Sequence, residues 1–119
     1  MLAFELTYSR DVVERAIVVM DARRGTVVHT ADGLTDAGMV AQGRSSRIAD
    51  LTVATKGAAA WIVREAPAGK ATLTVAVVDH RGRRELDAGP DVEPGSLAIS
   101  HAAVISWTRA GTSRTGRVR

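Results

Sequence analysis

The sequence predicts a mainly β protein: a small antiparallel β-sandwich or barrel of about eight strands, with at most one or two short helices. Apolar and polar residues alternate along short segments rich in Val, Ile and Thr, which is typical of strands with one buried face. Glycine and proline turns separate these segments at short intervals. A chain of 119 residues, 45% of them apolar, is long enough to form a single hydrophobic core.

The first predicted strand is Leu2–Tyr8, in which every second residue is large and apolar. The next segment, Ile17–Thr30, is interpreted as a hairpin that turns at Asp21–Gly25. The Asp21 carboxylate can accept hydrogen bonds from the backbone N–H groups of the turn, and Gly25 can adopt a left-handed conformation.

A helix over Asp11–Arg24 is the alternative for this region, because Asp11 and Glu14 have the spacing of a capping box. The β-branched residues that follow oppose a helix, since they lose side-chain freedom in one. A second segment, Ala76–Leu86, has the same order of residues: a valine pair, then Asp, Arg and Gly, and then a second strand segment. Its lead-in is the clearest alternating strand in the sequence, so the comparison favours the hairpin.

The rest of the chain continues the pattern of short strands. A long loop is expected over Ala31–Ser46, with one helical turn at Asp36–Gln42. The further strands are predicted at Arg47–Thr55, Ala58–Glu65, Ala71–Val78 and Ala102–Arg109. The predicted core consists of Leu51, Val53, Trp61, Leu73, Val75, Val77, Ile105 and Trp107.

Charge divides the chain into a β-domain, residues 1–108, and a basic C-terminal arm, residues 109–119. The chain has 16 Lys and Arg against 13 Asp and Glu, a net charge of +3. The arm contains no acidic residue, so it carries the whole positive excess, while the β-domain is nearly neutral. The basic residues of the arm are Arg109, Arg114, Arg117 and Arg119.

Composition excludes several classes of protein. There is no cysteine, which excludes disulfides, thiolate chemistry and cysteine zinc sites. The longest apolar runs, Ala58–Val63 and Val75–Val78, are too short to span a bilayer, and the start of the chain lacks the pattern of a signal peptide. We therefore expect a cytoplasmic protein, or part of a particle assembled in the cytoplasm, with no membrane partner. Arginine far exceeds lysine and asparagine is absent, which suits a bacterial or phage gene from a high-GC genome.

Two groups of residues are candidate binding sites. Arg23, Arg24 and Gly25 are a candidate anion site, formed by two guanidinium groups and the Gly25 N–H. The densest acidic segment is expected to accept the basic arm of a neighbouring copy. This segment contains Glu85, Asp87, Asp91 and Glu93.

The sequence gives no catalytic residues, metal site or cofactor. It lacks the glycine motifs that bind phosphates, and His29, His80 and His101 lack the paired spacing of metal ligands. Asp79 and His80 are neighbours on a predicted strand and would point to opposite faces, so they do not form a dyad.

The favoured function is that of a non-catalytic structural domain, which self-associates as a homo-oligomer or docks a protein partner through its basic arm. The alternative is a small nucleic-acid- or nucleotide-binding module that contacts phosphates through arginines. An enzyme is the third hypothesis, and it requires a pocket in which one of the histidines lies beside a carboxylate.

Overall fold

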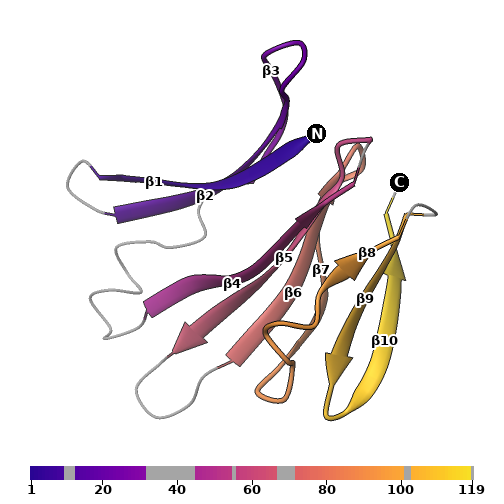
Figure 1. Ribbon diagram of the computed structural model, residues 1–119. Coiled ribbons are helices and arrows are strands. Elements are labelled where there is room, and N and C mark those ends of the chain that lie inside the picture. The colour runs from indigo at the N-terminus through magenta and orange to yellow at the C-terminus, as the bar shows by residue number, and fades with distance from the viewer. Residues whose placement is uncertain (10–12, 32–44, 55, 67–71, 101–102, 119) are drawn as a thin grey trace.

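The computed structural model describes residues 1–9, 13–31, 45–54, 56–66, 72–100 and 103–118 (Figure 1). The described residues form antiparallel strands and contain no helix. The strands are β1 (Leu2–Ser9), β2 (Val13–Asp21), β3 (Thr26–Ala31), β4 (Ser45–Val53), β5 (Ala59–Ala66), β6 (Thr72–Asp79), β7 (Gly82–Gly89), β8 (Ala98–Ile99), β9 (Val104–Arg109) and β10 (Thr112–Arg117).

The strands form three sheets, in the orders β1-β2-β3, β4-β5-β6-β7 and β10-β9-β8. Strands that are hydrogen-bonded within a sheet are therefore consecutive in the chain. Figure 1 shows the sheets as three layers, with β4–β7 in the middle.

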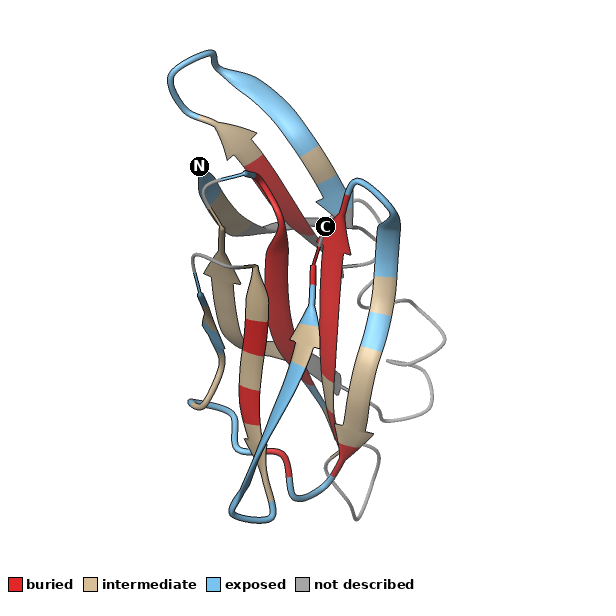
Figure 2. Ribbon diagram, turned by 90° about the vertical axis from the view of Figure 1, so that its right-hand side faces the viewer, coloured by how far each residue is buried: buried red, intermediate tan, exposed pale blue. Residues whose placement is uncertain are grey.

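The two middle strands of the central sheet, β5 and β6, contain runs of residues that are buried on both faces. All residues of 58–63 are buried, and so are all residues of 75–79 (Figure 2). A continuous apolar run is the pattern of a strand that is covered on both sides. The two apolar runs of the sequence are these two strands.

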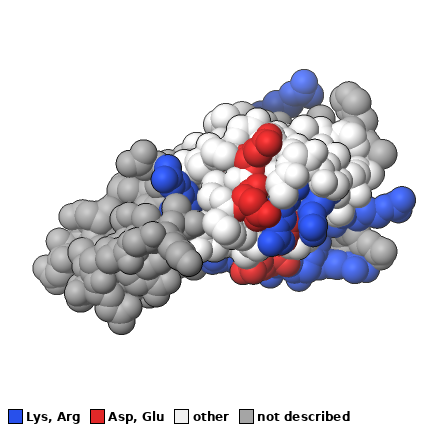
Figure 3. Space-filling view, turned by 90° about the horizontal axis from the view of Figure 1, so that it is seen from below, with Lys and Arg blue, Asp and Glu red and all other residues white. Residues whose placement is uncertain are grey.

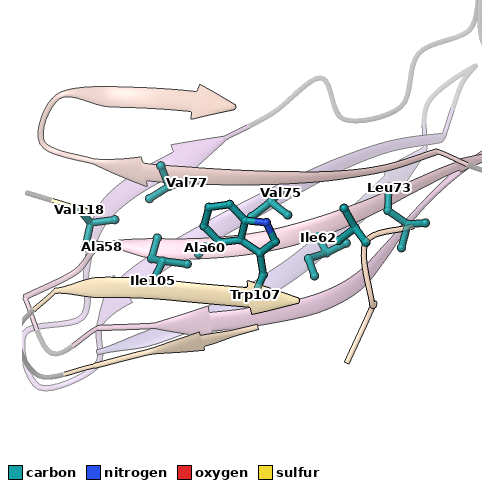
Figure 4. Close-up of a cluster of buried hydrophobic side chains, with 10 residues drawn as sticks. Ala58, Ala60, Ile62, Leu73, Val75, Val77, Ile105, Trp107 and Val118 are labelled. Carbon is teal, nitrogen blue, oxygen red and sulfur yellow. The ribbon is translucent and has the colours of Figure 1, made fainter. Parts of the chain in front are cut away.

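The first outer sheet covers one face of the central sheet. Ile17 and Val19 of β2 pack against Trp61 and Val78, and all four side chains are buried. The sheet β8–β10 covers the opposite face of the central sheet. Its Ile105 and Trp107 pack against residues of β5 and β6 that alternate with those of the first cluster. Figure 4 shows this second cluster, which includes Ala60, Ile62, Val75, Val77 and Val118. Neighbouring residues of β5 and β6 thus enter different cores.

The predicted hairpin at Ile17–Thr30 is confirmed. Val19 pairs with His29 and Asp21 with Thr26, with a register shift after Val19. The Gly25 N–H donates to the Asp21 carbonyl at 2.8 Å, and Gly25 has a φ of +66°. The helix over Asp11–Arg24 is wrong, because Val13–Asp21 is strand β2.

Other predictions are corrected or lie outside the described residues. The mainly β class is confirmed, but the count of eight strands is not, and the described strands form no closed barrel. The helical turn at Asp36–Gln42 and most of the loop Ala31–Ser46 lie outside the described residues. The predicted core residues are buried except Leu51 and Val53, which are half-buried.

Candidate interaction surfaces

The structure does not confirm a separate C-terminal arm. Thr112–Arg117 is strand β10, and it pairs with β9 along its length. Val118 is buried beside the second core, and its N–H donates to the carbonyl of Ala103 at 3.0 Å. Arg119 lies outside the described residues. The segment was predicted as an arm because it contains four arginines and no acidic residue, and most residues of β10 are in fact exposed.

Two carboxylates of the acidic segment bind an arginine of their own chain. Arg109 donates from Nη1 to Asp87 at 2.7 Å and from Nε to Asp91 at 2.9 Å. Arg114 lies further off, with Nη1 3.9 Å from Asp87. Arg109 is therefore paired within its own molecule, and its docking to another copy stays a prediction. We call Asp87, Asp91, Arg109 and Arg114 the acid–arginine cluster. Figure 3 shows acidic and basic side chains next to one another on the face of the molecule seen from below.

Asp87 is the least exposed member of the acid–arginine cluster, with a side chain that is 9% exposed. It also accepts a hydrogen bond from the Trp107 indole at 2.9 Å and one from the backbone N–H of Ala88. Burial alone would raise the pKa of Asp87, but these hydrogen bonds and the charge of Arg109 outweigh it and hold the pKa below its ordinary value. Glu85 and Glu93 are exposed and take no part in the cluster.

The candidate anion site on the β2–β3 turn is only partly available. The backbone N–H groups of Arg23 and Arg24 point to the Asp21 carboxylate, at 3.1 and 3.4 Å. The Gly25 N–H is bonded to the Asp21 carbonyl, so an anion cannot use it. The side chains of Arg23 and Arg24 are exposed. Arg24 forms an ion pair with Asp21, with Nε 3.8 Å from Oδ2, but its side chain is 82% exposed. Such a pair is weak, about 0–1 kcal/mol.

The β6–β7 turn repeats this chemistry with a stronger ion pair. Asp79 is buried, and its carboxylate accepts a hydrogen bond from the Arg81 N–H at 2.9 Å. Arg84 binds the same carboxylate through two hydrogen bonds, at 2.8 and 2.9 Å. The hydrogen bond to Asp79 raises the pKa of Arg84 above its ordinary value. Arg84 also reaches the carbonyl of Arg117 at 3.4 Å, which places the end of β10 beside this turn.

Cationic side chains gather at the end of the molecule that carries these turns. The β4–β5 turn lies at the same end, because a Cβ added at its Gly57 would lie 3.1 Å from Val28 of β3. Pairing of Ala59 with Val78 brings the β6–β7 turn next to it. The carboxylates of these turns are Asp21 and Asp79, of which Asp79 is buried, and Glu85 follows Arg84 on β7 and is exposed. We call this end the basic end; its cations are Arg23, Arg24, Lys56, Arg81, Arg83, Arg84 and Arg117.

Large apolar side chains are exposed at one corner of the first outer sheet. Leu2 pairs with Met20, and Met20 pairs with Val27, so these three residues form a row across the strands. Leu2 is 47% exposed and Val27 is 58% exposed. Met1 and Val28, which are also exposed, lie against Gly57. We call Met1, Leu2, Val27 and Val28 the apolar corner; they are the exposed large apolar residues among those whose exposure the structure describes.

The structure describes two of the three histidines. His29 is half-buried on β3, His80 is exposed at the β6–β7 turn, and His101 lies outside the described residues. Among the described residues, no group of three His, Asp or Glu is placed to hold a metal ion.

Sequence reasoning found the Asp21 turn but missed the Asp79–Arg84 pair and the exposed valines of β3. The run His-Arg-Gly-Arg-Arg at 80–84 is the signal that marks a second arginine-rich turn.

No known protein family, curated protein or solved structure matches this chain. Within the described residues there is no helix of the length and hydropathy that crossing a bilayer requires.

Proposed function

We propose that this chain is a non-catalytic assembly domain that associates with copies of itself through the first outer sheet. The observation that carries this proposal is the apolar corner. Among the residues whose exposure the structure describes, the other large apolar side chains are at least half-buried. Leu2 and Val27 are exposed in one cross-strand row with Met20, and Met1 and Val28 are exposed beside the β4–β5 turn. Contiguous exposed apolar surface on a soluble domain marks an interaction site.

The corner itself is small, and a stable interface buries about 800 Å² on each partner. The interface must therefore extend along the row of cross-strand neighbours, to half-buried Met20 and Phe4 of the same sheet. Contact between two copies of the same patch would give a closed dimer with two-fold symmetry. The basic arm that first suggested assembly has no part in this arrangement.

Sedimentation velocity at increasing protein concentration tests the proposal. The wild-type chain should form dimers in the micromolar range, and Val27→Asp should remain monomeric because it places a charge in the centre of the contact. Ser113→Asp is the control, since Ser113 is exposed on β10, in the other outer sheet. A wild-type chain that stays monomeric throughout, or a Val27→Asp chain that dimerises like it, would contradict the proposal.

A further inference from the structure

The β2–β3 hairpin extends beyond the body of the molecule as a two-stranded ribbon. In Figures 1 and 2 it reaches past the ends of the other strands, and its tip is exposed. Its turn carries Arg23 and Arg24 side by side, both exposed. Hydrogen bonds to the Asp21 carboxylate and from the Gly25 N–H fix the backbone conformation of the turn that carries the two arginines.

Further cations lie on the body beside the base of the ribbon. Lys56, Arg81 and Arg117 are exposed on three separate elements of the basic end. None of the three has an ion pair among the described residues. Asp79, the carboxylate of the β6–β7 turn, is buried and paired with Arg84. The basic end therefore presents a surplus of positive charge that the molecule does not use internally.

The shape and charge of this end fit duplex DNA. The major groove of B-form DNA is about 12 Å wide and admits a two-stranded β-ribbon. Arginine and lysine side chains beside such a ribbon can neutralise the phosphates that line the groove. We propose that the β2–β3 hairpin enters the major groove of B-form DNA while the cations of the basic end bind the backbone phosphates. This activity goes beyond assembly and does not depend on it.

Other polyanions fit the surface less well. Single-stranded nucleic acid is bound by stacking on exposed aromatic rings, and the described exposed apolar residues include no aromatic side chain. Double-stranded RNA has a major groove too deep and narrow for a ribbon. An anionic bilayer would take up apolar residues at the tip, but here the valines lie behind a charged turn. An acidic protein could bind the cations of a flat surface, so the projection of the β2–β3 hairpin favours DNA over an acidic protein partner.

Fluorescence anisotropy with a labelled DNA duplex of mixed sequence tests the proposal. The wild-type chain should bind with a dissociation constant of about 10⁻⁶ M at low salt, and the affinity should fall steeply as salt is raised. Because each lost phosphate contact lowers the salt slope by about 0.9, Arg81→Gln/Arg117→Gln should reduce the slope by about 2. Arg23→Gln/Arg24→Gln should weaken binding at least about tenfold.

The control is Arg64→Gln, because Arg64 is exposed on β5 outside the basic end; it should bind like the wild type. Melting temperatures of all variants should agree, since the substituted side chains are exposed. The proposal is overturned if the wild type does not bind the duplex at low salt. It is also overturned if Arg23→Gln/Arg24→Gln binds normally, or if double-stranded RNA or single-stranded DNA binds equally well. Oligomeric state measured on the same samples keeps this result separate from the assembly proposal, because these substitutions leave the apolar corner intact.

Discussion

Asp87 is the residue at which several distant parts of the chain meet. Its carboxylate joins β7 to Trp107 and Arg109 of β9, residues that are 20 and 22 positions away in sequence. The sequence marked Asp87 and Arg109 as interaction residues but assigned them to different copies. A local sequence pattern does not show partners this far apart, because only the packing of β9 against the central sheet brings them together. Local contacts were easier: Asp21 and Gly25 form their turn within five residues, and this turn was predicted correctly.

The lowered pKa of Asp87 makes stability depend on pH. A carboxyl group whose pKa is lower in the folded than in the unfolded chain stabilises the fold above the unfolded value, here about 3.8. That contribution is lost as pH falls through the folded pKa. We therefore expect the free energy of unfolding, measured with denaturant, to fall on the acid side of this value. Asp87→Asn should be less stable at neutral pH and should show a flatter decline in acid.

Glu93→Gln is the control for this measurement, because Glu93 is an exposed carboxylate without an ion pair among the described residues. It should follow the wild-type curve. If the free energy of unfolding of Asp87→Asn falls in acid as steeply as that of the wild type, another group causes the loss of stability at low pH.

Among the elements, the β9–β10 hairpin departs most from its sequence-based interpretation. Its strands are joined at Ala110-Gly111, and both residues have positive φ, +51° and +76°. Two positive φ values are typical of the tight turns that favour Asn-Gly, and alanine gives no sign of such a turn. The strand after it is polar because one side faces solvent and Gly116 replaces a core side chain: an added Cβ would lie 3.2 Å from Leu86. These local features resemble a solvated tail, which explains the prediction of an arm.

Ala110→Asn should stabilise the protein by about 1 kcal/mol, because a left-handed conformation is strained for alanine and tolerated by asparagine. Thermal unfolding would show a higher melting temperature. Ala22→Asn is the matched control, since Ala22 is exposed in the β2–β3 turn and does not have a positive φ. An equal gain at both positions, or none at Ala110, would mean that the hairpin turn is not strained.

At the scale of the whole molecule, the stack of three sheets follows from the apolar runs in β5 and β6. The sequence predicted the β class and most of the core from alternation and turns. It did not predict the number of layers, because both runs were interpreted only as strands of a sandwich or barrel. A run without alternation requires cover on both faces, so two further sheets are needed, and the chain supplies one before and one after the central sheet. The charged and apolar surfaces arise from this stacking, since each collects residues from several turns.

Removal of residues 109–119 tests whether the last strand belongs to this stack. The truncated chain loses β10, the Arg109 pairs and the buried Val118, whose side chain alone contributes about 1.5 kcal/mol. We expect a clearly lower melting temperature and binding of a dye that detects exposed apolar surface. Removal of Arg119 alone is the control and should leave both unchanged. A truncated chain that melts like the complete one would show that the segment is a dispensable arm, as its composition suggests.

The consecutive order of strands within each sheet has a consequence for how the chain folds. Pairing between neighbours in sequence keeps contact order low for an all-β protein, and proteins of low contact order fold fast. The sheets also follow one another in space as they do in the chain, so synthesis from the N-terminus produces the layers in the order in which they stack. The central sheet would then pack against the first outer sheet while its other face is still open to water. A nascent chain paused before β9 would expose Val75 and Val77, the surface that a chaperone binds and on which incomplete chains aggregate.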